Sequence, residues 1–298
     1  QGIVSVGQWG GQGVSSWSDV SADGVVSGIT IGYGDIVISL LFHFTSADGQ
    51  TSDSARHGGT GGEIKKVLFN YPEEYITAIT ISYGLHEGYA RTPLISSLTI
   101  KTNTAEYGPF GASGSDTTVT IPIEKGSVVG FFGRAGAFID ALGIHLRPTA
   151  NRKVVSIGPW GGQEGDFWTF VADFGVIRGI NIHYGQVIDS LQFLAKEADD
   201  KEETSGKFGG DGGEITKVIT INYPEEYITS FSITYGDFYD VTVIKSLTIT
   251  TNEDTYGPFG DSTSGVALTI PISSGDVVGF FGYADTYING LGVHLVPK

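Results

Sequence analysis

The stretch VVGFFGRAGAFIDALGIHL, residues 128–146, returns as VVGFFGYADTYINGLGVHL at residues 277–295. In both copies, runs of Val, Phe and Ile flank a short loop, which favours two β-strands joined as a hairpin. Earlier stretches repeat with nearly the same shift of about 150 residues, among them VSVGQWGGQG from Val4 and VSIGPWGGQEG from Val155. The 298-residue chain is therefore predicted to hold two tandem domains, residues 1–149 and 150–298.

A shorter period lies inside each copy. In the first copy, glycine turns recur about every 50 residues, at Gly34, Gly84 and Gly133. The segments GITIGYG, AITISYG and SLTIKTN alternate apolar and polar residues and are rich in Ile, Thr and Tyr, as all-β domains are. Three β units per copy favour a prism, sandwich or barrel. A six-bladed propeller is the alternative, but YPEEYIT and GFFG occur twice rather than six times.

Composition excludes several classes of function. The net charge of −16 disfavours nucleic acid and anionic lipid as partners, and no apolar run is long enough for membrane insertion. The chain has no cysteine, which rules out disulfides and thiolate zinc sites, and its six histidines show no metal-ligand spacing. We expect no metal and no cofactor, and a soluble protein of the cytoplasm or vacuole.

Three motifs carry a resemblance to a known family: G-Q/P-W-G-G, Y-G-P-F-G, and the GFFG…LG-I/V-HL stretch quoted above, each present once per copy. In this order they resemble the jacalin-related lectins over nearly the whole chain. The resemblance implies two tandem β-prism I domains, each of three four-stranded antiparallel sheets with pseudo-threefold symmetry. It also implies a lectin without catalytic activity, which binds mannose/glucose-containing glycans and glycoproteins, in a plant role such as defence or storage.

The family resemblance implies a main sugar loop of the form G-x-x-x-D. The first copy has GAFID, with Gly136, Ala137, Phe138 and Asp140. A carboxylate accepts hydrogen bonds from two sugar hydroxyls, and the N–H groups of Ala137 and Phe138 supply donors. In the partner turn, Val14 replaces the family's glycine but still offers its backbone N–H. The alternative is that Asp140 only caps a turn.

The second copy departs from this pattern. Its main loop reads DTYIN, with Asn289 in place of the Asp, although the partner Gly165 is retained.

A different loop of the second copy, GQVID, provides Gly185, Gln186, Val187 and Asp189, and the turn GGDGG ends at Gly213. Mannose-binding relatives of the banana lectin type resemble this in having a second such loop. The first copy has Ile38 at the matching place and should lack this site. The alternative is that Asp189 is an ordinary solvent-facing strand residue.

Three functions compete. The first is a mannose/glucose lectin. The family resemblance favours it over a galactose lectin, because galactose-preferring members resemble a cut form whose freed glycine amino terminus joins the site, whereas both copies here run uncut through the WGGQ turn. The second is a structural or protein-interaction prism that has lost sugar binding. The third is a carbohydrate-active enzyme, for which Glu73–Glu74 and Glu225–Glu226 are poor candidates, because adjacent strand residues point to opposite faces. Homo-oligomer formation stays open.

Overall fold

The computed structural model describes residues 2–114, 116–149, 153–196 and 199–298. The chain divides into two compact units, Gln1–Arg152 and Lys153–Lys298. The expected division between residues 149 and 150 touches residues 150–152, which lie outside the described residues. Every regular element in the described ranges is a β-strand, and none of these residues forms a helix long and apolar enough to cross a membrane.

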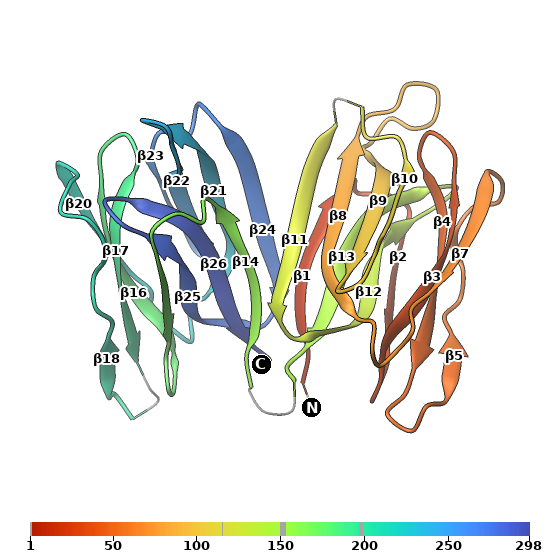
Figure 1. Ribbon diagram of the computed structural model, residues 1–298, viewed down its shortest axis with the longest axis horizontal. Coiled ribbons are helices and arrows are strands. Elements are labelled where there is room, and N and C mark those ends of the chain that lie inside the picture. The colour runs from red at the N-terminus through yellow and green to blue at the C-terminus, as the bar shows by residue number, and fades with distance from the viewer. Residues whose placement is uncertain (1, 115, 150–152, 197–198) are drawn as a thin grey trace. The chain divides into compact units, whose positions relative to one another are not determined.

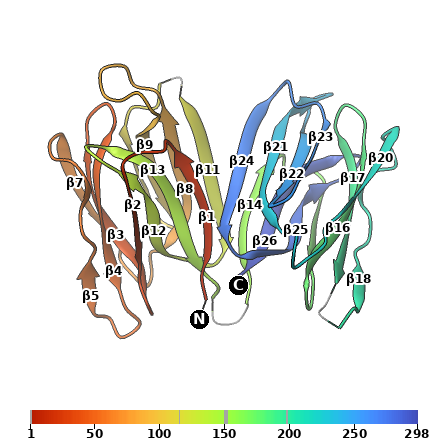
Figure 2. The same cartoon turned by 180° about the vertical axis from the view of Figure 1, so that it is seen from behind.

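Thirteen strands make up the first unit. The strands are β1 (Val4–Gly10), β2 (Ser15–Val20), β3 (Val25–Tyr33), β4 (Val37–Thr45), β5 (Thr51–Asp53), β6 (His57–Gly58), β7 (Glu63–Leu68), β8 (Ile76–Gly84), β9 (Leu94–Thr102), β10 (Glu106–Gly111), β11 (Thr117–Lys125), β12 (Ser127–Ala135) and β13 (Ile139–Arg147). They form three antiparallel sheets with strand orders β2-β12-β13-β1, β5-β4-β3-β7 and β10-β9-β8-β11, seen from two sides in Figures 1 and 2. β5 and β6 both pair with β4, so together they act as one interrupted edge strand.

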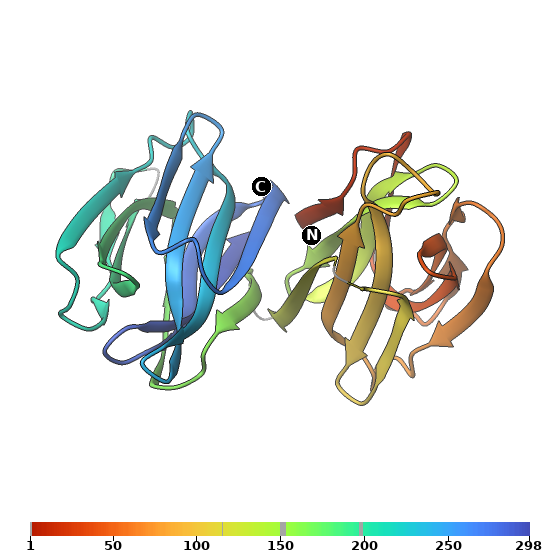
Figure 3. The same ribbon diagram turned by 90° about the horizontal axis from the view of Figure 1, so that it is seen from above.

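The second unit repeats this pattern. Its strands are β14 (Val155–Gly161), β15 (Asp166–Val171), β16 (Val176–Tyr184), β17 (Ile188–Lys196), β18 (Glu202–Thr204), β19 (Phe208–Gly209), β20 (Ile215–Thr220), β21 (Ile228–Phe238), β22 (Val241–Thr251), β23 (Thr255–Gly260), β24 (Val266–Ser274), β25 (Asp276–Ala284) and β26 (Ile288–Val296). Its sheets have the orders β15-β25-β26-β14, β18-β17-β16-β20 and β23-β22-β21-β24, with β19 also paired to β17. Figure 3 shows the strands of each unit from above. The prediction of two tandem all-β domains, each with three four-stranded sheets, is confirmed.

The inner faces of the three sheets meet in an apolar core in each unit. In the first unit, Phe42 of β4 stacks on Phe131 of β12, with ring centroids 4.5 Å apart. In the second, Phe193 of β17 stacks on Phe280 of β25 at 4.9 Å. All four rings are almost fully buried, and burying such a side chain stabilises the fold by about 1.5–3 kcal/mol. The hairpin loops at the ends of the strands therefore stand on a rigid scaffold.

Candidate functional site

Each sheet has one central hairpin, and each of these hairpins has a β-bulge beside its loop. In the first unit the register shifts between Gly32 and Tyr33, between Ser82 and Tyr83, and between Arg134 and Ala135. The second unit has the same shifts in the hairpins β16–β17, β21–β22 and β25–β26. A bulge leaves one extra residue unpaired and re-aims its side chain. The six extra residues, here termed the bulge residues, are Ile38, Ser96, Asp140, Asp189, Lys245 and Asn289.

Asp140 is the bulge residue of the β12–β13 hairpin. The preceding loop closes on itself, because the Gly136 N–H donates to the Phe138 carbonyl at 3.0 Å. The Asp140 carbonyl accepts from the Gly11 N–H at 2.8 Å, which ties this hairpin to the turn after β1. Only 7% of the Asp140 surface is exposed. Asp140 is thus a buried carboxylate at the base of a tight loop.

The Asp140 carboxylate has spare capacity to accept hydrogen bonds. Its Oδ2 atom is buried and has no hydrogen-bond partner among the described residues. Burial raises the pKa of Asp140, while the Arg134 charge and the Gly136 backbone act in the opposite direction. Arg134 is held beside the site, because its Nε donates to the Gly13 carbonyl at 2.8 Å. A buried acceptor without a donor is costly, so this oxygen is suited to an incoming hydroxyl.

Two features define the rim of the Asp140 loop. Gly13 lies against the carboxylate so closely that a Cβ atom there would be 2.0 Å from Asp140 Cγ. Val14 is 82% exposed, and its Cγ2 would be 3.1 Å from a Cβ at Gly136. Ala137 is exposed, while Phe138 is half-buried and packs edge-on against Tyr89 at 5.5 Å. Residues 136–140 and the turn containing Val14 are therefore brought together, with an aromatic pair beside them.

Asp189 is the bulge residue of the β16–β17 hairpin and has a closely similar setting. The Gly185 N–H donates to the Val187 carbonyl at 3.1 Å, and the Asp189 carbonyl accepts from the Gly210 N–H at 3.0 Å. A Cβ atom at Gly213 would lie 2.9 Å from Asp189 Oδ2. Only 6% of Asp189 is exposed, and burial raises its pKa against smaller opposing effects of the Gly185 backbone and His183. The geometry rules out an ordinary solvent-facing strand position.

Asn289, the bulge residue of the β25–β26 hairpin, lies differently. It is fully buried, with 0% exposed, and its Nδ2 donates to the Glu164 carbonyl at 2.8 Å. Asp285 is exposed, and its Oδ1 accepts from the Tyr287 N–H at 3.3 Å. Gly165 adopts φ +84°, and a Cβ there would be 2.5 Å from the Ala284 carbonyl oxygen. The loop and its partner turn meet, and the Asn289 Nδ2 is engaged by the protein, whereas its Oδ1 is buried with no hydrogen-bond partner among the described residues.

The remaining bulge residues carry no carboxylate. Ile38 lies against Gly62, where a Cβ atom would be 2.7 Å from Ile38 Cδ1. Ser96 is fully buried, and Lys245 forms an ion pair with Asp261. Sequence reasoning missed Lys245 and Ser96. A sequence signal was available, because each of these residues directly follows a buried isoleucine near the start of the hairpin's second strand. Ser96 follows Ile95 in β9, and Lys245 follows Ile244 in β22.

Other candidate groups have structural roles. Glu74 accepts hydrogen bonds from Thr102 and Tyr107 at 2.7 and 2.8 Å, whereas Glu73 is exposed, so the two do not form a catalytic pair. Burial raises the pKa of Glu74, but the hydrogen bonds from Asn70, Thr102 and Tyr107 together hold it below its usual value. Among the described residues, no group of three or more His, Asp or Glu side chains could hold a metal ion.

Buried His145 hydrogen-bonds Ser5 and Ser18 across the sheet at 2.7 and 2.9 Å, and burial lowers its pKa. This histidine therefore cross-links strands β1, β2 and β13 and faces no binding loop.

Comparison with known proteins identifies the family of this chain. The family model described as the Jacalin-like lectin domain matches residues 6–145 and 157–294. A mannose/glucose-specific lectin of Parkia platycephala is 35% identical over 303 residues, which cover 100% of this chain and 66% of the relative. An agglutinin of Castanea crenata is 32% identical over 309 residues, with 98% of each chain covered. Among solved structures, a mannose binding jacalin related lectin from Ananas comosus is 33% identical and covers 49% of this chain and 100% of its own, with a TM-score of 0.46.

Proposed function

This chain belongs to the jacalin-like lectin family, and we propose that it binds mannose and glucose residues of glycans through one loop in each domain. The first proposed domain, residues 1–149, uses Gly136 to Asp140 with the turn at Val14. The second, residues 150–298, uses Gly185 to Asp189 with the turn ending at Gly213. The observation that carries the proposal is the pair of buried carboxylates, each at a β-bulge beside a glycine turn but in different hairpins of the two domains.

The chemistry of a hexose fits this arrangement. Two neighbouring hydroxyls donate to the carboxylate, and each charge-assisted hydrogen bond contributes roughly 1.5–3 kcal/mol. The ring oxygen and O6 need donors, which the N–H groups of Ala137 and Phe138, or of Gln186 and Val187, supply without loss of side-chain entropy. Phe138, braced by Tyr89, offers an apolar surface to the sugar ring in the first domain. No step requires a metal ion, a cofactor or a catalytic group.

The second domain's main loop is a poorer candidate. Asn289 is fully buried and its Nδ2 already donates to the Glu164 carbonyl, so its Oδ1 is the one side-chain atom left to accept from a sugar hydroxyl. An amide also lacks the charge that strengthens binding to a carboxylate. We therefore assign Gly165 and Asn289 to the support of this loop and place the second domain's sugar at Asp189.

Two weak sites on one covalent chain gain through effective concentration when a glycan or surface presents several mannose residues. The proposed partners are mannose/glucose-containing glycans and glycoproteins, and two sites suffice for agglutination without a homo-oligomer. The chain spans 66% of the Parkia lectin's length. We propose a non-enzymatic protein of the cytoplasm or vacuole, in keeping with the absence of cysteine.

The test uses the intact chain on immobilised mannan and in mannose titration calorimetry. We expect two mannose sites per chain, no release of free sugar, and no binding of galactose as the control sugar. Asp140→Ala and Asp189→Ala should each remove one site, and the double variant should bind nothing. Unchanged binding by a folded double variant would refute the assignment, and release of sugar from mannan would point to an enzyme.

A further inference from the structure

The β21–β22 hairpin of the second unit has a lysine, Lys245, at its bulge. The Lys245 stem lies between two glycines, since Cβ atoms at Gly236 and Gly265 would be 3.6 and 3.5 Å from its Cδ. This is the setting that receives a carboxylate in the β16–β17 hairpin. An ammonium group donates hydrogen bonds and accepts none, so Lys245 cannot replace the Asp189 carboxylate as an acceptor of sugar hydroxyl hydrogens.

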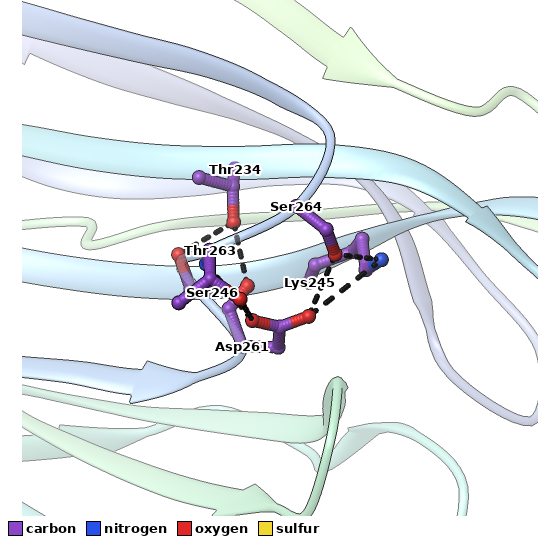
Figure 4. A network of polar contacts seen from close by, with 6 residues as sticks. All are labelled: Thr234, Lys245, Ser246, Asp261, Thr263 and Ser264. Carbon is purple, nitrogen blue, oxygen red and sulfur yellow. Dashed lines mark hydrogen bonds and ion pairs between the residues drawn. The ribbon is translucent and has the colours of Figure 1, made fainter.

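Figure 4 shows what Lys245 contacts. Its Nζ hydrogen-bonds Ser264 and lies 3.8 Å from Asp261 Oδ2. The Asp261 carboxylate also accepts from the Ser264 hydroxyl at 2.7 Å and from the Thr263 N–H at 2.8 Å. The hydrogen bonds from Ser264 and Thr263, aided by the nearby Lys245 charge, hold the pKa of Asp261 far below its usual value. Residues 261–264 are thus closed into a rigid turn around an ionised carboxylate.

The turn is also anchored through its backbone. The Thr234 hydroxyl donates to the Asp261 carbonyl at 3.0 Å and bonds Ser246 at 2.7 Å (Figure 4). The Asp261 N–H is shared between two carbonyls, those of Lys245 and Gln186, each at 3.0 Å. Gln186 belongs to the loop that carries Asp189, so the network ends on the proposed sugar loop.

The contact with Gln186 matters because of peptide geometry. The peptide bond between Gln186 and Val187 is planar, and in the trans form its C=O and N–H point in opposite directions. Holding the Gln186 carbonyl on the Asp261 N–H therefore fixes the direction of the Val187 N–H. That N–H is one of the two backbone donors assigned to the sugar.

We propose that Asp261 and Lys245 are positioning residues for the second domain's sugar loop: they hold the turn that orients the Gln186–Val187 peptide without touching the sugar. The proposal rests on the function assigned above to Asp189. The first domain has the same backbone contact, from the Ala112 N–H to the Asp35 carbonyl at 3.2 Å. There Ala112 and Ser96 replace Asp261 and Lys245 and cannot form such a network, and the loop they support has Ile38 rather than a carboxylate at its bulge.

The experiment measures mannose affinity of the intact chain in an Asp140→Ala background, which leaves only the second-domain site. Asp261→Ala should weaken mannose binding by about three- to ten-fold, the effect of losing one ordinary hydrogen bond. Asp261→Asn keeps an oxygen for the Thr263 N–H and should recover most of that affinity. Glu253→Ala removes an exposed carboxylate in a different turn of the same domain and should change nothing.

Lys245→Met keeps the aliphatic stem and provides a second test if Asp261→Ala does not fold. We expect it to lower mannose affinity by about two- to three-fold. Unchanged affinity in a folded Asp261→Ala or Lys245→Met protein overturns the proposal. An equal loss in Glu253→Ala would reveal a general charge effect and overturn it as well. If the Asp140→Ala parent binds no mannose at all, the second-domain site itself is wrong, which is a failure of the proposed function rather than of the positioning network alone.

Discussion

Replacing Ile38 with Asp should create a second mannose site in the first domain, at the β3–β4 loop. The loop around Ile38 already has the hydrogen bonds of the Asp189 loop. Gly34 N–H donates to the Ile36 carbonyl at 3.0 Å, and Gly59 N–H donates to the Ile38 carbonyl at 3.1 Å. The matching distances around Asp189 are 3.1 and 3.0 Å. The two loops thus share their backbone framework and differ at the bulge residue.

The expected gain follows from the chemistry of that one side chain. A new carboxylate at the bulge would accept from sugar hydroxyls, and one charged hydrogen bond contributes about 1.5–3 kcal/mol. At about 1.4 kcal/mol for each tenfold change, the gain is about 10- to 150-fold in affinity. Ile38 is partly exposed and lies against Gly62, so its loss should lower the free energy of unfolding by only about 1 kcal/mol.

The assay is a gain of function in the Asp140→Ala, Asp189→Ala double variant, which should not bind mannose. Adding Ile38→Asp should restore binding to immobilised mannan, with one site per chain by calorimetry. Ile38→Ala in the same background removes the apolar side chain without adding an acceptor and should restore nothing. If the triple variant Asp140→Ala, Asp189→Ala, Ile38→Asp folds but does not bind mannan, the idea that the bulge carboxylate is the missing component is refuted.

Three further predictions concern the existing sites. EDTA should leave mannose binding intact, because the described residues contain no metal-ligand cluster; binding lost in EDTA and regained with calcium would contradict the account. Burial raises the pKa of Asp140 and Asp189, and protonation removes the charged acceptor, so affinity followed by calorimetry should fall on acidification with a midpoint above the usual Asp pKa of about 3.9; a midpoint at or below that value would argue against these carboxylates. Gly212→Ala places a Cβ 2.4 Å from Asp189 Oδ1 and should abolish the second-domain site at an unchanged melting temperature, whereas two intact sites would show that the turn is not part of it.

Much of the fold could be predicted from local pattern. The repeat of residues 128–146 at 277–295 encodes the same hairpin twice, and β12–β13 and β25–β26 are those hairpins. Alternation in segments such as AITISYG predicts strands, because strand side chains point alternately to core and solvent. Asp140 and Asp189 could be singled out as candidate site residues because each lies four residues after a glycine, in a G-x-x-x-D motif. Such a motif involves neighbouring residues in the chain.

The rest depends on contacts between distant segments. The Asn289 amide donates to the Glu164 carbonyl, 125 residues away in sequence. An ionised carboxylate has no hydrogen to donate and could not form that bond. The network of Lys245, Asp261 and Gln186 forms only after the sheets have packed around one core. The β-bulges that aim all six side chains depend on cross-strand register, which no single segment reveals.

A crystal structure of the intact chain with a mannoside tests the central claim that the two domains bind sugar through non-equivalent loops. The account predicts one sugar on the Asp140 carboxylate of the first domain and one on the Asp189 carboxylate of the second, each also held by loop N–H groups. The loops of Ile38 and Asn289 should hold no sugar. A sugar beside Asn289, with the Asp189 loop empty, would contradict it.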